Sequence, residues 1–206
     1  MSSKASNPVH RCIDFSAKRL LFTGNAAVQE LTIRARTQES EVDRSVGFAP
    51  VARPDARILI LGSLPGQRSI QARQYYAHRQ NTFWRIMRDL LGADGSYQRR
   101  CDTLCAHRIA LWDVLAQSVR RGSMDADIEL GTAEVNDFGG FFRAHHDIEM
   151  IAFNGQKAAQ MFRRFVAQSG IDIPGEQLTM PSTSPAYAAM PYSRKLEIWR
   201  SVVIAL

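Results

Sequence analysis

Cysteine is scarce in this sequence: Cys12, Cys101 and Cys105 are the only three among 206 residues. An odd number of cysteines does not suit a disulfide framework, and no second Cys/His cluster offers the paired spacing of a structural zinc site. Cys101, Cys105 and His107 lie close enough in sequence to be considered as metal ligands, but a fourth ligand is missing. Reduced thiols of a cytoplasmic protein are the simpler interpretation, and we expect no metal.

Long apolar runs are absent as well. No uninterrupted apolar stretch approaches the roughly 20 residues that a membrane span needs, and the N-terminus has no apolar core followed by a small-residue cleavage site. The hydrophobic fraction of 45% and the charged fraction of 22% are those of a soluble globular protein. With 206 residues the chain has room for one domain but not for two ordinary ones. We therefore expect a soluble, monomeric protein without membrane contact.

Acidic residues are outnumbered by basic ones, 20 against 26, which gives a formal charge of +6 and a pI near 9.6. Such a balance favours polyanionic partners such as nucleic acid. The excess consists mainly of arginine and is scattered along the chain, so an ordinary solvated surface explains it equally well.

The first 46 residues differ in composition from the remainder. They mix Ser, Arg, Gln and Glu with few apolar residues, and only Cys12–Leu31 has the pattern of a short amphipathic helix or strand. We interpret residues 1–46 as an appended arm, either partly disordered or the result of a start site upstream of the working domain. The working domain is predicted to comprise residues 47–206.

Apolar β-branched runs and helical periodicities alternate along the predicted domain. Arg57–Gly62 is a short apolar run ended by glycine, and Thr82–Leu91 has its apolar residues at helical spacing before Gly92. Similar patterns predict strands at 108–113, 149–154 and 177–180, and helices at 156–168 and 193–206. This alternation predicts an α/β fold with a parallel sheet covered on both faces.

The four predicted strands would deliver the loops that follow them to one edge of the sheet, where ligands bind in such folds. Those loops are 62–81, 113–123, 154–155 and 181–186. They are rich in Gly, Ser, Thr and Pro, whose hydroxyls and exposed backbone amides can bind phosphate oxygens. Ordinary turn chemistry explains any single loop, but their convergence predicts a binding site.

One segment is unusual for a loop. Tyr75–Trp84 concentrates four aromatic rings, a histidine and an asparagine directly before the predicted helix. Aromatic faces stack on nucleobases, at roughly 1–3 kcal/mol per base in single-strand binders. Phe83 and Trp84 also begin the apolar face of the helix, which suits core residues. Asn81 is placed to cap the helix, and capping is compatible with a catalytic role.

Several motifs follow one another in a fixed order. Leu61-Gly-Ser-Leu-Pro-Gly66 precedes Tyr75-Tyr-Ala-His78 and Asn81-Thr-Phe-Trp84. Later stretches are Ile109-Ala-Leu-Trp-Asp-Val-Leu115, Arg121-Gly-Ser-Met-Asp125, Phe153-Asn-Gly-Gln-Lys157 and Met180-Pro-Ser-Thr-Ser-Pro-Ala186. This series resembles the hypoxanthine-DNA (DNA-deoxyinosine) glycosylase family of the uracil-DNA glycosylase superfamily, and mismatch-specific uracil-DNA glycosylases are similar over the first motif. The resemblance covers residues 47–206 and is more specific than any single glycine-rich loop.

The resemblance implies a three-layer αβα sandwich with a central four-stranded parallel sheet. It also implies hydrolysis of the N-glycosidic bond of deoxyinosine in DNA, without metal or cofactor. Asn81 is then the expected catalytic residue, whose amide orients a water toward the anomeric carbon. No carboxylate occupies the Ser63-Leu64-Pro65 turn, where stronger uracil glycosylases have a polar water-activating residue. Slow turnover and a preference for easily extruded bases would follow, because extrusion costs a few kcal/mol.

The same resemblance implies the other site residues and the location. The base pocket is expected to contain Gly62, Ser63, Leu64, Pro65, Gly66, Tyr76, His78, Phe83, Trp112, Asp113 and Asn154. DNA contacts are expected from Ser69, Gly155, Lys157, Pro181, Ser182, Thr183, Ser184, Pro185 and Tyr187. DNA as the partner suggests a cytoplasmic protein associated with the nucleoid.

Two positions depart from the family pattern. Arg79-Gln80 stands where a Pro-Arg pair is usual, which leaves the path of this loop open. Tyr187 stands where a small polar Asn is common, and it is either an aromatic wedge or a packing residue on the closing helix. Three alternatives also stay open: uracil removal from G·U mispairs, a catalytically silent DNA-binding module, and a nucleoside or ester hydrolase. The last has no Gly-x-Ser-x-Gly elbow or obvious Ser, His and Asp set to support it.

Overall fold

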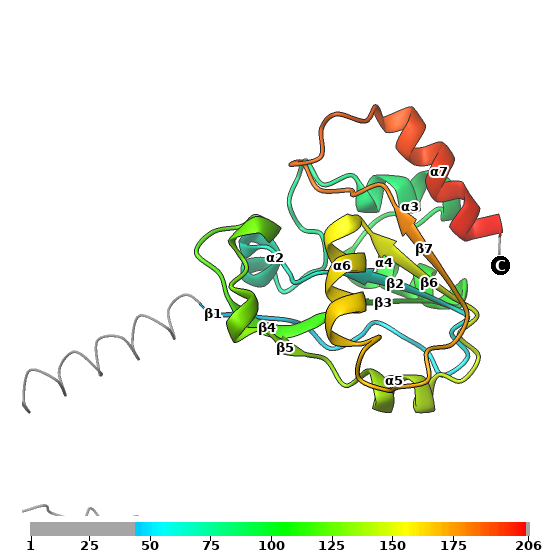
Figure 1. Cartoon of the computed structure of the whole chain (residues 1–206). Coiled ribbons are helices and arrows are strands. Elements are labelled where there is room, and N and C mark those ends of the chain that lie inside the picture. The colour runs from blue at the N-terminus through cyan, green and yellow to red at the C-terminus, as the bar shows by residue number, and fades with distance from the viewer. Residues whose placement is uncertain (1–43, 205–206) are drawn as a thin grey trace, which may run out of the picture. The chain divides into compact units, whose positions relative to one another are not determined.

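The structure is a computed structural model that describes residues 44–204. Two β-sheets organise this part of the chain (Figure 1). The larger sheet is parallel, with strand order β3-β2-β6-β7. Its strands are β2 (Ile58–Gly62), β3 (Ile109–Asp113), β6 (Met150–Asn154) and β7 (Glu176–Met180). The smaller sheet is antiparallel, in the order β1 (Arg44–Val46), β4 (Leu115–Val119) and β5 (Glu134–Val135). The helix or strand considered for Cys12–Leu31 lies outside the described residues.

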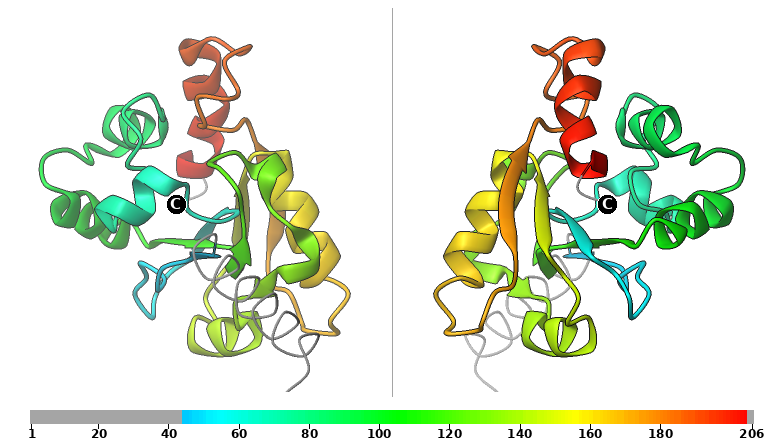
Figure 2. Two further views of the ribbon diagram at one scale, coloured as in Figure 1. Left: turned by 90° about the vertical axis from the view of Figure 1, so that its left-hand side faces the viewer. Right: turned by 90° about the vertical axis from the view of Figure 1, so that its right-hand side faces the viewer.

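Alternate residues of the parallel strands point to opposite faces of the sheet, and each face carries its own hydrophobic core. Leu59 and Leu61 of β2 pack with α5 (Phe138–Ala144) and α6 (Gln156–Phe165) on one face. Ile58 and Ile60 pack on the other face, with α3 (Phe83–Leu91), α4 (Tyr97–Ala106) and α7 (Tyr192–Ile204). Figure 2 shows these helix layers on the two sides of the sheet. The predicted three-layer αβα sandwich with a four-stranded parallel sheet is confirmed.

The strands and helices predicted for the domain are all present, and their ends within the described residues coincide with the prediction or differ from it by up to three residues. Gly92 ends α3 in a left-handed conformation, with φ of +72°, as its position after the apolar periodicity indicated. None of the helices between residues 44 and 204 combines the length and apolar character that a bilayer span requires.

The smaller sheet was not predicted. The segment 113–123, expected as a loop, contains β4, which is a correction to the sequence analysis. Strand β1 pairs with β4 although it falls within the expected N-terminal arm. Helix α2 (Gln67–Ala72) lies in the loop that follows β2, and α4 and α5 also had no counterpart among the predicted elements.

The strand order places a topological switch point between β2 and β6. The chain continues from β2 to β3 on one side and from β6 to β7 on the other side, so the connections that leave these two neighbouring strands diverge. Crevices at such points are the usual ligand sites of open α/β sheets. The functional site is therefore expected beyond Gly62, at the carboxyl end of β2.

Candidate active site

A cavity of about 450 Å³ opens at the carboxyl edge of the parallel sheet. The strand register brings the ends together, because Gly62 pairs with Asp113 and Asn154 pairs with Met180. The volume lies within the range of small-molecule sites, which is about 300–1,000 Å³. Besides strand ends, the lining consists of Ser63, Leu64, Pro65, Gly66, Gln67, Arg68, Ser69, Tyr75, Tyr76, His78, Asn81, Ser123, Met124, Asp125, Ala126, Ser182, Thr183, Ser184, Pro185, Ala186 and Tyr187.

Gly62 is at the most crowded point of this edge. A Cβ atom on it would lie 2.2 Å from Asp113 Oδ1 and 2.9 Å from the Tyr76 hydroxyl oxygen. Glycine at this position therefore allows the Asp113 carboxyl and the Tyr76 hydroxyl to approach the end of β2 closely.

Two buried polar atoms of the cavity have no hydrogen-bond partner among the described residues: the Tyr76 hydroxyl oxygen and Asp113 Oδ2. Burial raises the pKa of Asp113 to about 8, and the charge of Asp125 contributes to the rise. The Asp113 carboxyl is therefore largely neutral at pH 7 and can donate as well as accept. An unpaired buried polar group costs about 1–3 kcal/mol, so both atoms indicate a ligand that would satisfy them.

Replacing Asp113 by asparagine should change how stability depends on pH. The pKa of Asp113 lies near 8 in the folded protein and at 3.8 ordinarily, so folding takes up a proton between these values. This group's contribution to the free energy of unfolding is complete below pH 4 and falls, by up to about 1.4 kcal/mol per pH unit, toward pH 8. Asp113→Asn removes that decline, which urea unfolding at pH 5, 6.5 and 8 measures. Identical pH slopes for both proteins would contradict the assigned pKa.

Asn81 reaches the cavity from the start of α3. Its Oδ1 accepts a hydrogen bond from the backbone N–H of Phe83 at 3.0 Å, so the side chain caps the first N–H of the helix from one residue before the N-cap position, which Thr82 occupies. Its Nδ2 has no hydrogen bond to another described residue and lies at the cavity. The cap fixes the plane of the amide, and this leaves its donors available to a bound molecule.

Hydrogen bonds of Thr183 join the loop after β7 to Asn154 and to Thr82, the residue that follows Asn81. Asn154 donates to Thr183 Oγ1 at 2.8 Å and accepts from the Thr183 backbone N–H at 2.9 Å. The Thr183 carbonyl in turn accepts from the backbone N–H of Thr82 at 3.0 Å. Thr183 is completely buried, so these bonds are shielded from water. Asn154 therefore lines the cavity and also positions the loop that contains Thr183.

The Tyr75–His78 loop is held against α2 and α3. Ser69 Oγ accepts from the backbone N–H of Ala77 at 3.2 Å, and His78 Nδ1 accepts from the backbone N–H of Gln80 at the same distance. Tyr76 adopts a left-handed conformation with φ of +55°, which is uncommon for a bulky residue. Its ring packs on Phe83, with centroids 4.2 Å apart. This packing presents the Tyr76 hydroxyl to the cavity.

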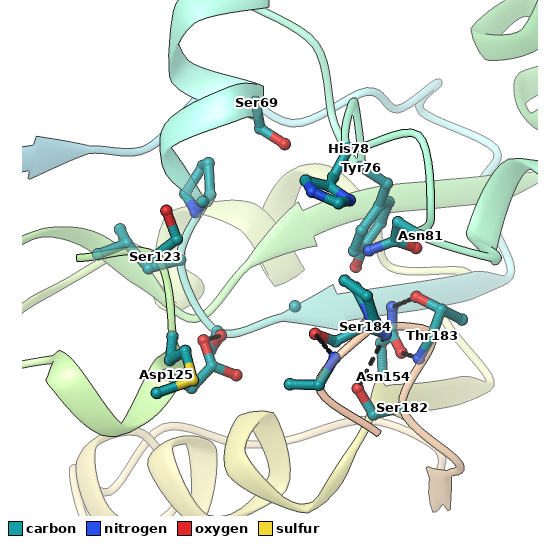
Figure 3. A pocket seen from close by; sticks show the side chains of 18 of the residues that line it. Ser69, Tyr76, His78, Asn81, Ser123, Asp125, Asn154, Ser182, Thr183 and Ser184 are labelled. Atoms are coloured by element: carbon teal, nitrogen blue, oxygen red, sulfur yellow. Dashed lines mark hydrogen bonds between the residues drawn. The ribbon is translucent and has the colours of Figure 1, made fainter. Parts of the chain in front are cut away.

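The most important residue that the sequence analysis left out of the site is Asp125, at the start of the 3₁₀ helix η1 (Asp125–Asp127). Its Oδ1 accepts a hydrogen bond from the Ser63 hydroxyl at 2.6 Å. Figure 3 shows Asp125 and Ser123 on the side of the cavity opposite to Asn81. A carboxylate thus does reach the Ser63-Leu64-Pro65 turn, although none belongs to it. The available signal was the position of Asp125 within the stretch Arg121–Asp125.

Arg120 was also missed. It is 1% exposed, and its guanidinium donates to the carbonyls of Leu64 and Pro65 and to Ser45 Oγ. Burial lowers the pKa of Arg120, while the negative charges of Asp125 and Asp113 oppose that effect. Arg120 therefore fixes the Gly62–Gly66 turn to strand β1 and places a positive charge beneath the two carboxyls.

Most residues predicted for the site line the cavity, but two base-pocket predictions require correction. Phe83 is completely buried in the core between the sheet and α3. Trp112 packs on the opposite face of the sheet, against Phe138 and Phe141, and its indole N–H donates to the carbonyl of Phe48. Both side chains follow the apolar faces of their elements, away from the cavity.

Three of the predicted DNA contacts also lie outside the lining. Gly155, with φ of +97°, is the N-cap of α6. A Cβ atom on Gly155 would lie 2.8 Å from the Cβ atom of Ser182, so the absence of a side chain makes room for Ser182. Pro181 accepts a hydrogen bond from the Trp199 indole through its carbonyl. Lys157, on the first turn of α6, is near enough to Asp125 to favour the charged form of that carboxyl.

Tyr187 packs on the closing helix, whereas its use as an aromatic wedge stays a prediction. Its side chain is on the rim of the cavity and the residue is 41% exposed. Lys195 of α7 donates to its carbonyl at 2.7 Å, and the ammonium lies 5.0 Å from the ring centroid. Tyr187 thus contacts the closing helix and still presents its ring to solvent.

Within residues 44–204, no three His, Cys, Asp or Glu side chains gather as ligands. Cys101 is buried in α4 and Cys105 is partly buried, both as free thiols.

Comparisons with known proteins agree on one superfamily. A model of the uracil DNA glycosylase superfamily matches residues 49–203. A hypoxanthine DNA glycosylase of Methanosarcina acetivorans is 36% identical over 159 residues, which is 76% of this chain and 96% of the relative. One of Methanosarcina barkeri is 38% identical over 117 residues, or 55% and 73% of the two chains. A solution NMR structure from M. acetivorans, described as a candidate uracil DNA glycosylase, has a TM-score of 0.64 and 33% identity, covering 77% of this chain and 98% of that one.

Proposed function

The chain belongs to the uracil DNA glycosylase superfamily, and from this membership we propose that it hydrolyses the N-glycosidic bond of deoxyinosine in DNA. The products are free hypoxanthine and an abasic site. Support for this base comes from two relatives named hypoxanthine DNA glycosylase, at 36% and 38% identity. DNA is accordingly the macromolecular substrate. A monomeric state and a cytoplasmic, nucleoid-associated location stay predictions.

The observation that carries the proposal is the Asn81 amide, fixed by its cap and open to the cavity. An amide offers two N–H donors and, on its oxygen, a second lone pair. These groups can orient a water toward the anomeric carbon of an extruded nucleotide. Positioning of this kind lowers the barrier without any change of charge on the enzyme.

Recognition of the base falls to the unpaired polar atoms of the cavity. The neutral Asp113 carboxyl can accept an N–H and donate to a carbonyl oxygen, and the Tyr76 hydroxyl offers a further donor. The lactam edge of hypoxanthine presents an N–H and a carbonyl side by side. Binding the base would satisfy atoms that are otherwise buried without partners.

Exposed apolar side chains on the rim suit the gap that an extruded base leaves in the stack. Met124 is 56% exposed and Tyr187 is 41% exposed, and the two approach the cavity from separate loops. Insertion of such side chains between base steps is a known means of stabilising distorted DNA. The polar loop Ser182–Ser184 next to Tyr187 offers hydroxyls and backbone amides to phosphates.

Uracil removal is the second candidate, because the 33% identical structure is described as a candidate uracil DNA glycosylase. The two bases are separated by incubating the protein with oligonucleotides that carry inosine or uracil opposite each of the four bases, followed by alkaline cleavage of abasic sites. We expect faster cleavage at inosine. Faster cleavage at G·U pairs would assign the second function, and no cleavage with retained DNA binding would indicate a silent binding module.

Affinity for an inosine-containing duplex should fall steeply as salt rises. Each phosphate neutralised by Lys or Arg contributes a slope of about −0.9 to a plot of log affinity against log salt. Arg68 lines the cavity and Lys157 lies beside Asp125, so a slope of at least two such contacts is expected. Fluorescence anisotropy between 50 and 300 mM salt measures it, and an affinity indifferent to salt would contradict phosphate binding.

A further inference from the structure

The hydrogen bond between Ser63 and Asp125 joins two loops across 62 residues of sequence. Ser63 follows the last residue of β2, and Asp125 arrives from the segment after β4, so the fold brings together groups that no local motif contains. The oxygen–oxygen distance of 2.6 Å is that of a hydroxyl donating to an ionised carboxylate. Ser63 thereby fixes the orientation of the Asp125 side chain.

The second oxygen of Asp125 is left available. No hydrogen bond from a residue between 44 and 203 reaches Oδ2, and Asp125 lines the cavity. Arg120 supplies positive charge nearby, but its hydrogen bonds go to Leu64, Pro65 and Ser45 rather than to the carboxylate. Arg120 therefore partly compensates the negative charge of Asp125 but makes no hydrogen bond to its carboxylate.

Asp113 and Asp125 differ in what surrounds them. Burial raises the pKa of both, but Asp125 has the Ser63 hydroxyl, Arg120 and Lys157 to favour its charged form. Asp113 has only Arg120, and the charge of Asp125 raises its pKa further. Environments that favour the neutral form of one carboxyl and the charged form of another are typical of sites that use the first as a neutral group and the second as an anion.

We propose that Asp125 is the catalytic carboxylate of the glycosylase reaction and that Ser63 is its positioning residue. The inference rests on the proposed function. Asp125 faces Asn81 across the cavity, so a sugar held between them has the amide on one side and the carboxylate on the other (Figure 3). The carboxylate takes the place of the polar residue that the Ser63-Leu64-Pro65 turn lacks.

The C1′–N9 bond breaks and its electron pair leaves with the purine, while the anionic Asp125 stabilises the positive charge that develops on the sugar. The water held by Asn81 supplies the electron pair of the new C1′–O bond, and the proton it loses passes to solvent. The purine anion takes up a proton from solvent, and Asp125 stays ionised throughout.

The test compares Asp125→Asn with Asp127→Asn, which removes the same charge two residues away. Asp127 does not line the cavity, and its Oδ2 accepts from the backbone N–H of Met124, a bond that asparagine can keep. Under single turnover with an inosine duplex, Asp125→Asn should lower the excision rate by a factor of about 10²–10³. Its affinity for the duplex and its melting temperature should stay close to those of the wild type. Asp127→Asn should excise at nearly the wild-type rate.

A pH profile separates catalysis from a structural effect. Ser63, Arg120 and Lys157 favour the ionised form of Asp125, and its charge acts on Asp113 and Tyr76. The wild-type rate should fall at low pH as Asp125 is protonated, and Asp125→Asn should lose this acid limb. Ser63→Ala should move the limb to higher pH, because the hydroxyl no longer holds the pKa of Asp125 down.

The possible outcomes are distinct. A wild-type rate and an unchanged acid limb in Asp125→Asn would overturn the role of Asp125 while leaving the proposed function intact. An acid limb that stays in place in Ser63→Ala would overturn the positioning role of Ser63. A wild-type protein that releases no base from any duplex would remove the proposed function and this inference with it.

Discussion

Replacing Asn81 by alanine should lower the single-turnover rate of hypoxanthine excision by a factor of about 10²–10³, the usual effect of removing one preorganised hydrogen-bonding group from a transition state. The amide is held by its bond to the Phe83 N–H, so it needs no reorganisation when the reaction begins. Binding of the inosine duplex should change little, because phosphate contacts from other loops supply most of the affinity. Single-turnover excision and anisotropy titrations measure the two quantities separately.

The same substitution also removes a helix cap, which costs about 1 kcal/mol of stability. Ser96→Ala is a matched control, because Ser96 Oγ caps α4 by accepting from the Arg99 N–H at 3.2 Å and lies outside the cavity lining. It should lose comparable stability and keep the wild-type excision rate. If Ser96→Ala and Asn81→Ala lost the same fraction of activity, the effect of Asn81 would be one of stability rather than chemistry.

Replacing Arg120 by methionine should lower the free energy of unfolding by about 3–5 kcal/mol, the range found when one partner of a buried charge network is removed. The substitution leaves the carbonyls of Leu64 and Pro65 without their donor. It also leaves Asp113 and Asp125 without the nearest cation that lowers their pKa values. Methionine fills a similar volume, so the loss reports the polar contacts rather than a cavity.

Arg121→Met provides the comparison within the same segment. Arg121 is well exposed, with 74% of its side chain accessible, and its ion pair with Glu129 spans 3.8 Å. Surface ion pairs contribute about 0–1 kcal/mol, so this variant should unfold close to the wild-type denaturant midpoint. Equal midpoints for the two variants would show that the buried guanidinium does not hold the turn.

The parallel sheet could be predicted because its strands are apolar on both faces. Ile58–Leu61 is an unbroken apolar run completely buried between two helix layers, and such runs stand out in a sequence. Strand β4 could not be predicted in the same way, because Ala116, Gln117 and Ser118 have low strand propensity. Its partners are only a three-residue strand 75 positions upstream, at Arg44↔Val119, and a two-residue strand downstream.

One part of the candidate site could be predicted from the sequence, and another part could not. Loops that end parallel strands must meet at one edge, so the grouping of Gly62, Asp113 and Asn154 was accessible from the pattern alone. The contacts of Ser63 with Asp125 and of Arg120 with Pro65 depend on the positions of β4 and of the segment that follows it, and the sequence pattern predicts a loop there. Trp112 does not line the site because alternation along β3 turns its side chain into the hydrophobic core on one face of the sheet, whereas the cavity lies at the carboxyl edge.

The expectation of slow turnover rested on the absence of a carboxylate from the Ser63-Leu64-Pro65 turn. Asp125 changes the premise, since its carboxylate contacts Ser63 from another loop. The structure therefore gives no reason to expect a low excision rate from the wild-type protein. Base extrusion, which costs a few kcal/mol and least at mispairs, still favours weakly paired deoxyinosine.

The most direct test is to identify the base that the wild-type protein releases from a duplex containing a single deoxyinosine. Chromatography with mass detection should find free hypoxanthine in an amount equal to the abasic sites revealed by alkali. A parallel incubation with Asn81→Ala should yield little of either within the same time. Intact deoxyinosine after prolonged incubation with excess folded wild-type protein would contradict the proposed activity.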